Sequence, residues 1–393
     1  MGGIYIVDNG AYSIKAESST KSSPRVVPNC IMKAKSEKRR PFVGDQIEEC
    51  RDASGLFYIL GFQKGYLVNW DVQKTVWDYV FGDLCSKGNF KETSVVVTEP
   101  CFNFPSIQEA ANEIFFEEYE CHSLLRINPS DLSAFHYLKK ETKASNCLIV
   151  DTGYSFTHIV PYIKSKKYKE GIIRIDVGGK LLTNHLKEII SYRQLHVMDE
   201  TYVINQVKED CCFVSNNFKL DMNTTNKKWP ENHIIQDYIL PDFTTIRRGH
   251  SIPIDQTNQT DYQKLRLNNE RFTVPELLFH PSDIGIKQMG IAEAIVASVF
   301  KCPSHTHSYL FKNIVLTGGN AKFPGMQKRV YDDVRSLVPH EYDINVHLPD
   351  DPVGYAWRGG VRLSKDAGFY SMVVTKEEYD EEGSNVCYER FDV

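Results

Sequence analysis

Several features are scarce in this chain of 393 residues, and each absence narrows the class of protein. Its ten cysteines are scattered without a C-x-x-C pair, and no signal peptide precedes the first expected strand, so we expect reduced thiols. No apolar run approaches the ~20 residues needed to cross a bilayer. With 46 basic against 51 acidic residues, the net charge of −5 argues against a generally basic nucleic-acid binder. The sequence predicts a soluble protein of the nucleus or cytosol.

What the chain does contain is one turn pattern that occurs twice. IYIVDNGAYSIK at residues 4–15 and CLIVDTGYSFTH at residues 147–158 each indicate an apolar strand, a tight polar turn and a second strand. Copies this far apart indicate two similar α/β halves, because the units of a solenoid recur every few tens of residues. Ligands of such folds bind where strand ends face a crevice. The repeat therefore predicts a ligand cleft between two α/β domains.

The turns of this pattern suit phosphate chemistry. In DNGAYSIK the glycine turn lets backbone N–H groups approach phosphate oxygens, Asp8 suits a water-held Mg²⁺, and Lys15 supplies a positive charge. The same residues also suit an ordinary hairpin, since Asp-Asn-Gly is common there. IVLTGGNAKFPG at residues 314–325 indicates a strand, a glycine turn and a helix, which fits an anion site and a plain connection about equally.

Basic clusters in the sequence are less specific. Residues 35–40 and 247–248 are candidates for contacting DNA or acidic histone surfaces, although solvated loops explain both slightly better. Lys166, Lys167 and Lys169 are interpreted as parts of an exposed turn. No set of cysteine and histidine residues has the spacing of a standard zinc module, so we predict no metal site built from side chains.

Eight stretches of the chain resemble the actin family in sequence, order and spacing. They are FVGDQ (42–46), GYLVNWD (65–71), VVTEPCFN (96–103), VDTGYSFTHIVP (150–161), RIDVGGKLLTNHL (174–186), NERFTVPELLFHPSDIG (269–285), LTGGNAKFPG (316–325) and YAWRGG (355–360). The resemblance covers nearly the whole chain, and finer details resemble one nuclear branch of the actin-related proteins. It implies the two-lobed actin-type ATPase fold, with two duplicated α/β domains, or four subdomains, around a nucleotide cleft.

The resemblance also implies how the chain is divided. A first lobe would contain residues 1–137 and 341–393, with a second subdomain at about 28–66. A second lobe would contain residues 138–340, with a fourth subdomain at about 179–271. Both Asp-x-Gly turns would then face one polyphosphate from opposite lobes.

A nucleotide site carries over residue by residue. The positions that match the two phosphate loops and the surroundings of the nucleoside are Asp8, Asn9, Gly10, Lys15, Asp151, Gly153, Gly179, Lys208, Glu209, Gly318, Gly319 and Phe323. The implied cofactor is ATP or ADP with Mg²⁺ in a structural role, since a bound ligand stabilises the folded state by mass action. A cleft partly filled by Tyr12 and Tyr154 and empty of nucleotide is the open alternative. His158 matches the actin histidine near the attacking water.

Departures from actin concern the hydrolytic groups. Where actin has Ser-Gly, this chain has Ala11 and Tyr12, and an acidic residue with its following glycine becomes Tyr154 and Ser155. A phenol stays neutral near pH 7 and supplies no carboxylate. Pro129 falls where actin carries a water-orienting glutamine. Because losing one such group costs about 10² to 10⁴ in rate, we predict no catalytic residue and no useful hydrolysis, so that the chain is not an enzyme.

The resembled branch implies a function in the nucleus, with some protein in the cytoplasm. Its members are structural subunits of an ATP-dependent chromatin-remodelling complex that exchanges a variant histone into nucleosomes. The implied partners are the remodeller ATPase and a zinc-HIT-type subunit, with contact to nucleosomal DNA or histones and none to a membrane. The branch is not a homopolymer.

Two alternatives remain at this stage. A cytoskeletal, filament-forming actin-related protein is disfavoured because the stretch between Asn29 and Phe42 is short and lysine-rich, and residues 242–269 form a longer segment than in actin. An independent kinase or weak ATPase of the same fold would need an acidic base in the cleft. No residue is assigned that role, and the close matches to actin speak against this alternative.

Overall fold

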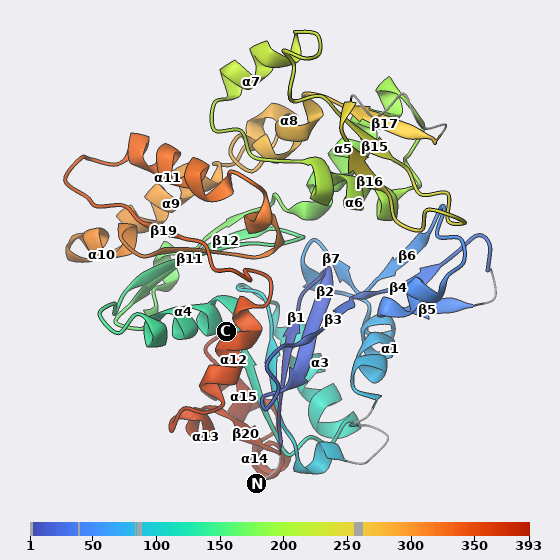
Figure 1. Ribbon diagram of the computed structural model, residues 1–393. Helices are drawn as coiled ribbons and strands as arrows, with labels where there is room; N and C mark the ends of the chain where they lie inside the picture. The colour runs from blue at the N-terminus through green and yellow to red at the C-terminus, as the bar shows by residue number, and fades with distance from the viewer. Residues whose placement is uncertain (1–2, 38–39, 83, 85–88, 255–261) are drawn as a thin grey trace.

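Two sheets of six strands each form the centres of two lobes that meet along a junction (Figure 1). The computed structural model describes residues 3–37, 40–82, 84, 89–254 and 262–393. Each sheet combines an antiparallel meander with parallel strands, and helices pack around it. This layered arrangement defines an α/β fold.

The first sheet has its central strands fully buried. Its strands, in order across the sheet, are β20 (Val374–Thr375), β10 (Ser123–Ile127), β9 (Ser94–Thr98), β1 (Ile4–Asn9), β2 (Ser13–Ser18) and β3 (Arg25–Pro28). Strands β9 and β10 read SVVVT and SLLRI, and every residue of both is buried. Unbroken buried runs of this kind are typical of parallel strands that are covered on both faces.

The second sheet repeats the connectivity of the first. Its path is β13 (Lys166–Lys167), β12 (Thr157–Ile163), β11 (Cys147–Thr152), β18 (Ile314–Thr317) and β19 (Val346–His347), with β14 (Ile173–Ile175) also paired to β12. Strand β11 pairs antiparallel with β12 and parallel with β18, as β1 does with β2 and β9. Asp8 lies opposite Lys15 in one sheet, and Asp151 lies opposite His158 in the other. The predicted duplication of two α/β domains is confirmed.

Helices surround both sheets. Around the first sheet lie α1 (Trp70–Val80), α3 (Pro105–Glu113), α12 (Tyr355–Leu363), α13 (Phe369–Met372), α14 (Lys376–Glu382) and α15 (Ser384–Arg390). Around the second lie α5 (Gly179–Arg193), α6 (Thr201–Cys211), α7 (Phe218–Thr225), α8 (Glu270–Glu276), α9 (Ile291–Lys301), α10 (His307–Phe311) and α11 (Met326–Leu337). On α5, Leu182, Leu186 and Ile190 are fully buried, and the neighbouring Ile189 is half-buried against the same core.

Helices α4 (Pro129–Lys140) and α12 pack closely at the junction of the lobes (Figure 1). Their backbones approach so closely that a Cβ on Gly359 would lie 2.1 Å from the carbonyl oxygen of Leu132. Only glycine fits such an approach, since real Cβ atoms do not come within this distance of a backbone oxygen. The YAWRGG stretch therefore fixes how the two helices at the junction meet.

Smaller sheets lie at the outer ends of the lobes. They are β5 (Pro41–Val43), β4 (Cys30–Lys33) and β6 (Phe57–Leu60); β7 (Phe62–Gln63) and β8 (Tyr66–Leu67); and β16 (His250–Ile252), β15 (Gln236–Ile239) and β17 (Lys264–Leu267). The core under β4 and β6 includes Met32, Phe42 and Leu56, and two side chains from the other lobe, Tyr202 and Phe243, pack against it. The lobes thus contact one another above the junction as well. The exact residue bounds of the four subdomains stay a prediction.

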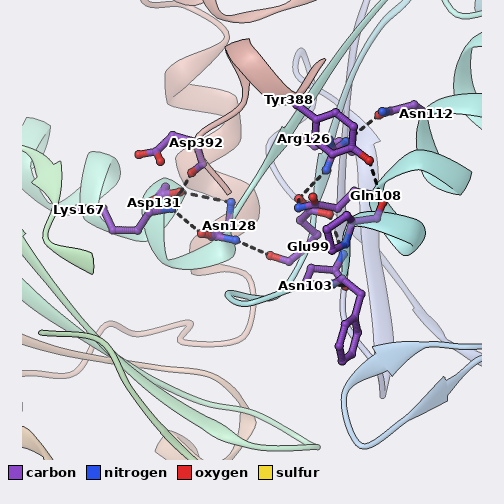
Figure 2. Close-up of polar contacts among 12 residues, drawn as sticks. Glu99, Asn103, Gln108, Asn112, Arg126, Asn128, Asp131, Lys167, Tyr388 and Asp392 are labelled. Atoms are coloured by element: carbon purple, nitrogen blue, oxygen red, sulfur yellow. Dashed lines mark hydrogen bonds and ion pairs between the residues drawn. The ribbon is translucent and has the colours of Figure 1, made fainter. Parts of the chain in front are cut away.

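Lys166, Lys167 and Lys169 were expected to form an exposed turn, and for Lys167 that prediction is wrong. Its side chain is only 4% exposed, on β13 of the second lobe (Figure 2). The ammonium donates to Oδ1 of Asn128 at 2.6 Å and to the backbone oxygen of Asp392 at 2.6 Å, and it pairs with Oδ2 of Asp131 at 3.1 Å. The physical reason is that Asn128, Asp131 and the end of the chain converge on this lysine at the junction.

A buried polar network continues from that point into the first lobe (Figure 2). Asn128 donates to the backbone oxygen of Glu99 at 2.9 Å. The carboxylate of Glu99 accepts from Nη1 of Arg126 at 2.7 Å, from Gln108 at 2.9 Å and from Asn103 at 2.8 Å. Buried charges with several partners of this kind are expensive to disrupt. The network therefore ties the junction to the interior of the first sheet.

Two expectations drawn from composition can be compared with the structure. The nine cysteines in the described part of the chain are free and buried. Among the described residues, no helix combines the length and the apolar character that membrane crossing requires.

Candidate functional site

A cavity of about 640 Å³ lies between the two lobes. Every residue that the sequence assigned to a nucleotide site lines it, from both Asp-x-Gly turns to Gly318, Gly319 and Phe323. They converge because the first strand of each sheet ends at the junction, and the turns that follow face one another. That these residues bind nucleotide stays a prediction.

The first turn places a carboxylate and an ammonium side by side. Asp8 and Lys15 are cross-strand neighbours on β1 and β2, and Lys15 Nζ lies 3.2 Å from Asp8 Oδ2. The hydroxyl of Thr98 donates to the other carboxylate oxygen at 2.9 Å and accepts from the backbone N–H of Asn9. Asn9 itself points into the first lobe, because its Oδ1 accepts from the Trp77 indole at 3.2 Å. The Asn9 side chain therefore anchors the turn to the interior of the first lobe.

The second turn holds a carboxylate whose charge is disfavoured. Burial and the nearby charge of Asp8 raise the pKa of Asp151 to about 6. The glycine turn after β18 packs directly on this strand end, since a Cβ on Gly318 would lie 2.3 Å from the carbonyl oxygen of Thr152. Gly318 has φ +90, a conformation that favours glycine. At the next residue, Gly319, an added Cβ would meet no atom within 4 Å.

Two tyrosines meet across the cavity. The ring of Tyr12, in the first turn, lies 5.1 Å from the ring of Tyr154, in the second turn, with the ring planes tilted by 38°. Asn205 of α6 donates to the Tyr12 hydroxyl at 3.0 Å. Burial raises the pKa of Tyr154 to about 12, so its phenol is neutral at physiological pH. Tyr154 therefore faces the cleft, as the sequence predicted, and contributes an aromatic wall in place of a carboxylate.

A hydrogen-bonded cluster on α5 and α6 lines the part of the cavity that the resemblance assigns to a nucleoside. Lys208 Nζ donates to the backbone oxygen of Gly179 at 3.2 Å, to Thr183 at 2.9 Å and to Asn205 Oδ1 at 2.8 Å. An ammonium has three donors, so all of them are used within the second lobe. Asn205 also donates to Glu209 at 2.8 Å. Lys208 therefore links α5 to α6 through its three hydrogen bonds. Burial of the ammonium lowers the pKa of Lys208.

His158 and Pro129, the two positions that the resemblance relates to ATP hydrolysis, both line the cavity. His158 Nε2 is buried and has no hydrogen-bond partner among the described residues. Burial, with the charge of Arg174, lowers the pKa of His158 to about 3, so the ring is neutral at pH 7. Pro129 is the first residue of α4 and lines the same cavity without a side-chain donor or acceptor.

Comparison with known proteins assigns the whole chain to one family. A sequence model described as Actin matches residues 3–392. The chain belongs to the actin family. Within the actin family it is similar to actin-related protein 6 of Drosophila melanogaster, at 48% identity over 97% of both chains. It is also similar to actin-like protein ARP6 of Cryptococcus neoformans, at 40% identity over 99% of this chain and 84% of the relative, and to actin-related protein 6 of Arabidopsis thaliana, at 34% identity over all of both chains.

These relatives belong to the branch of actin-related proteins that the finer sequence details indicated. The resemblance to that branch is therefore confirmed. The two-lobed actin-type fold is confirmed with it. Members of the actin family typically bind nucleotide in the cleft between the lobes.

The residues of this actin-family cleft fit a polyphosphate accompanied by a cation. Asp8 and Asp151 bring two carboxylates to one cavity, and their repulsion contributes to the raised pKa of Asp151. A divalent cation would relieve that repulsion. Lys15 and the backbone N–H groups of the two glycine turns would hold phosphate oxygens. The cation would supply charge neutralisation, while the chain's own residues position and shield the ligand.

Sequence reasoning missed two residues of this actin-family site. Asn205 connects Tyr12, Lys208 and Glu209, and Thr98 connects Asp8 with Asn9. The spacing of Asn205 before Lys208 and Glu209 places all three near one face of α6, which is a signal that could have indicated it. Thr98 offered no such signal, because its partners are about ninety residues away in the sequence.

Proposed function

We propose that this actin-related protein is a non-filamentous structural subunit of an ATP-dependent chromatin-remodelling complex that exchanges a variant histone into nucleosomes. In this role it joins the remodeller ATPase and a zinc-HIT-type subunit in the nucleus, with a further pool in the cytoplasm. Its cleft binds ATP or ADP with Mg²⁺ as a structural ligand and does not hydrolyse it. The similarity to actin-related protein 6 over nearly the whole chain supports the proposal.

The contact between Tyr12 and Tyr154 is the observation that carries it. Hydrolysis needs an oriented water and charge stabilisation beside the terminal phosphate. Here the two loops that would surround that phosphate carry aromatic rings packed against each other, and Pro129 lines the wall where a water-orienting amide is required. Tyr154 stands where actin carries a carboxylate and Pro129 where it carries an amide, and the loss of these two groups favours a structural over a catalytic role for the cleft.

Contacts between the lobes outside the cleft favour the same role. The backbone N–H of Gly55 donates to both carboxylate oxygens of Glu200, at 3.1 and 3.0 Å. Tyr202 and Phe243 pack on the apolar core beneath β4. These contacts join the lobes outside the cleft and add to whatever a bound nucleotide contributes there. A fixed shape of this kind suits a subunit whose surfaces position partners.

The basic clusters contribute less to the proposal than the sequence suggested. Arg248 pairs with Asp210 at 2.9 Å and Arg40 pairs with Glu49, so two of the candidate DNA-binding side chains already have acidic partners. Lys35 lies 3.7 Å from Asp199. Residues 38 and 39 lie outside the described part of the chain. Contact with DNA or histones remains part of the proposal.

Affinity purification of the tagged full-length chain from nuclear extract tests the proposal, with phosphate release and sedimentation measured on the same preparation. We expect co-recovery of a remodeller ATPase and a zinc-HIT-type subunit, bound nucleotide in the denatured eluate, and no phosphate release above background from the isolated chain. A chain that pellets as filaments would favour the cytoskeletal alternative. A monomer that turns over ATP would favour the enzyme.

A further inference from the structure

A second hollow of about 630 Å³ lies at the seam between the lobes, next to the cleft. One wall comes from the first lobe, around β6 and β7, and the other comes from α5 of the second lobe. The hollow and the cavity between the lobes share four lining residues, Ala11, Phe62, Tyr154 and Ser155. We call it the seam groove. Its volume falls in the range that is typical of ligand pockets.

The floor of the seam groove is apolar and incompletely covered. Leu60 and Phe62 contribute from the first lobe, and Leu181 and Ile284 from the second. Leu60, Leu181 and Ile284 are only half-buried, so each leaves apolar surface facing the groove. An apolar side chain seated there would gain about 25 cal/mol for each Å² of apolar surface removed from water.

The charges at the groove are mainly positive, and one comes from each lobe. Lys64 lies between β7 and β8, and Lys180 lies in the first turn of α5. Neither ammonium has an ion pair within 4 Å in the part of the chain described by the structure. The other charged side chain of the lining is Glu188, which lies 3.9 Å from His185. Two free lysines therefore face one carboxylate that is already near a histidine.

The Lys64 turn is held in place from the opposite lobe. Arg174 of β14 donates to the backbone oxygen of Lys64 at 3.0 Å and to the Tyr66 hydroxyl at 2.7 Å. Its guanidinium also lies over the Phe156 ring, 4.5 Å from the centroid. The groove is thus built across the seam by fixed contacts, and it exists only while the lobes keep this arrangement.

We propose that the seam groove binds an acidic segment of a partner protein that also carries an apolar side chain. Carboxylates of the segment pair with Lys64 and Lys180, and its apolar side chain covers Leu60, Leu181 and Ile284. Duplex DNA fits less well, because its surface offers phosphates to the lysines and nothing apolar to the floor. This proposal deepens the structural role proposed above, since it names one surface through which such a subunit holds a partner.

Selection of phage-displayed random dodecapeptides on the full-length chain tests the groove. The recovered sequences are expected to combine aspartate or glutamate with an apolar residue. A fluorescein-labelled selected peptide is then titrated against the native chain and against the Lys64→Glu/Lys180→Glu variant. We expect affinity to fall at least about tenfold, equivalent to 1.4 kcal/mol. The matched control is Lys219→Glu/Lys301→Glu on α7 and α9, which contribute no residue to the groove and should bind normally.

A variant of the apolar floor and a competition with duplex DNA test the two parts of the proposal separately. Leu181→Ser should weaken the same peptide without changing its salt dependence, because it removes apolar contact only. The proposal is overturned if the selected peptides bind the Lys64→Glu/Lys180→Glu variant as well as the native chain, or if selection recovers no acidic sequence. It is also overturned if a duplex oligonucleotide competes for the groove and acidic peptides do not. Normal co-purification of remodeller subunits in those cases would leave the structural role intact while removing the groove.

Discussion

The ring of Tyr12 and the ring of Tyr154 lie 5.1 Å apart, although they belong to turns on opposite lobes. Tyr12 is further held by the hydrogen bond from Asn205 at 3.0 Å. An aromatic pair of this geometry contributes about 0.5–1.5 kcal/mol beyond the area that it buries. Two aromatic side chains from opposite lobes therefore bridge the cleft between its two Asp-x-Gly turns.

Restoring small and acidic groups at this bridge should separate binding from hydrolysis. In Tyr12→Gly/Tyr154→Asp, we expect tighter Mg²⁺-ATP binding, because the backbone can approach phosphate and a carboxylate joins the cation's water shell. Phosphate release should stay at background, because Pro129 still offers no group to orient water. Fluorescent-nucleotide titration and a phosphate-release assay measure the two effects. Tyr370→Ala, at an exposed tyrosine on α13, is the control, and turnover in the double variant would contradict the prediction.

The two glycines after β18 should respond differently to the same substitution. Gly318→Ala places a methyl group 2.3 Å from the Thr152 carbonyl oxygen at φ +90, so we expect a loss of about 1–3 kcal/mol in the free energy of unfolding. Gly319→Ala is the matched control, since an added Cβ there meets nothing within 4 Å. Urea unfolding followed by circular dichroism measures both. Equal losses would show that the close approach at Gly318 is not the cause.

Asp151→Asn should remove part of the pH dependence of stability. Because the folded-state pKa of Asp151 is raised to about 6 from an ordinary 3.8, its contribution is most favourable below pH 3.8 and is lost as pH rises through 6. In EDTA, the variant should therefore be more stable than the native chain at pH 8, by about 1–3 kcal/mol. That advantage should shrink toward zero near pH 4.

Thermal unfolding across this pH range provides the measurement for Asp151. Asp283→Asn, at an exposed carboxylate, is the control and should change little at any pH. A variant that is less stable than the native chain at pH 8 would contradict the sign of the argument.

Lys167→Met should destabilise the junction strongly. It removes the ion-pair partner of Asp131, whose pKa is raised by burial. It also leaves Oδ1 of Asn128 and the backbone oxygen of Asp392 without the ammonium that donates to them. Breaking one partner of a buried pair typically costs about 3–5 kcal/mol. Lys166→Met is the matched control, because Lys166 is exposed on the same strand and should change stability by no more than about 0.5 kcal/mol. Denaturant unfolding of the two variants decides the point, and similar midpoints would contradict it.

The sequence predicted the candidate site better than it predicted the junction. Each half of the site is a local pattern, because Asp8, Gly10 and Lys15 lie within one strand–turn–strand unit, as do Asp151 and Gly153. Lys167 was misread because its partners lie 36 and 225 residues away along the chain. A cluster of lysines resembles an exposed turn whenever the acidic groups that bury one of them are that distant.

The sequence by itself determined the duplicated α/β architecture and the residues that face the cleft, because strand, turn and glycine chemistry act over a few neighbouring positions. Only the tertiary structure decided that Tyr12 meets Tyr154, that Lys208 uses its donors within the second lobe, and that Lys64 and Lys180 share a groove. Those contacts depend on how the two lobes pack against each other. That packing is determined by interactions between residues that are far apart in the chain.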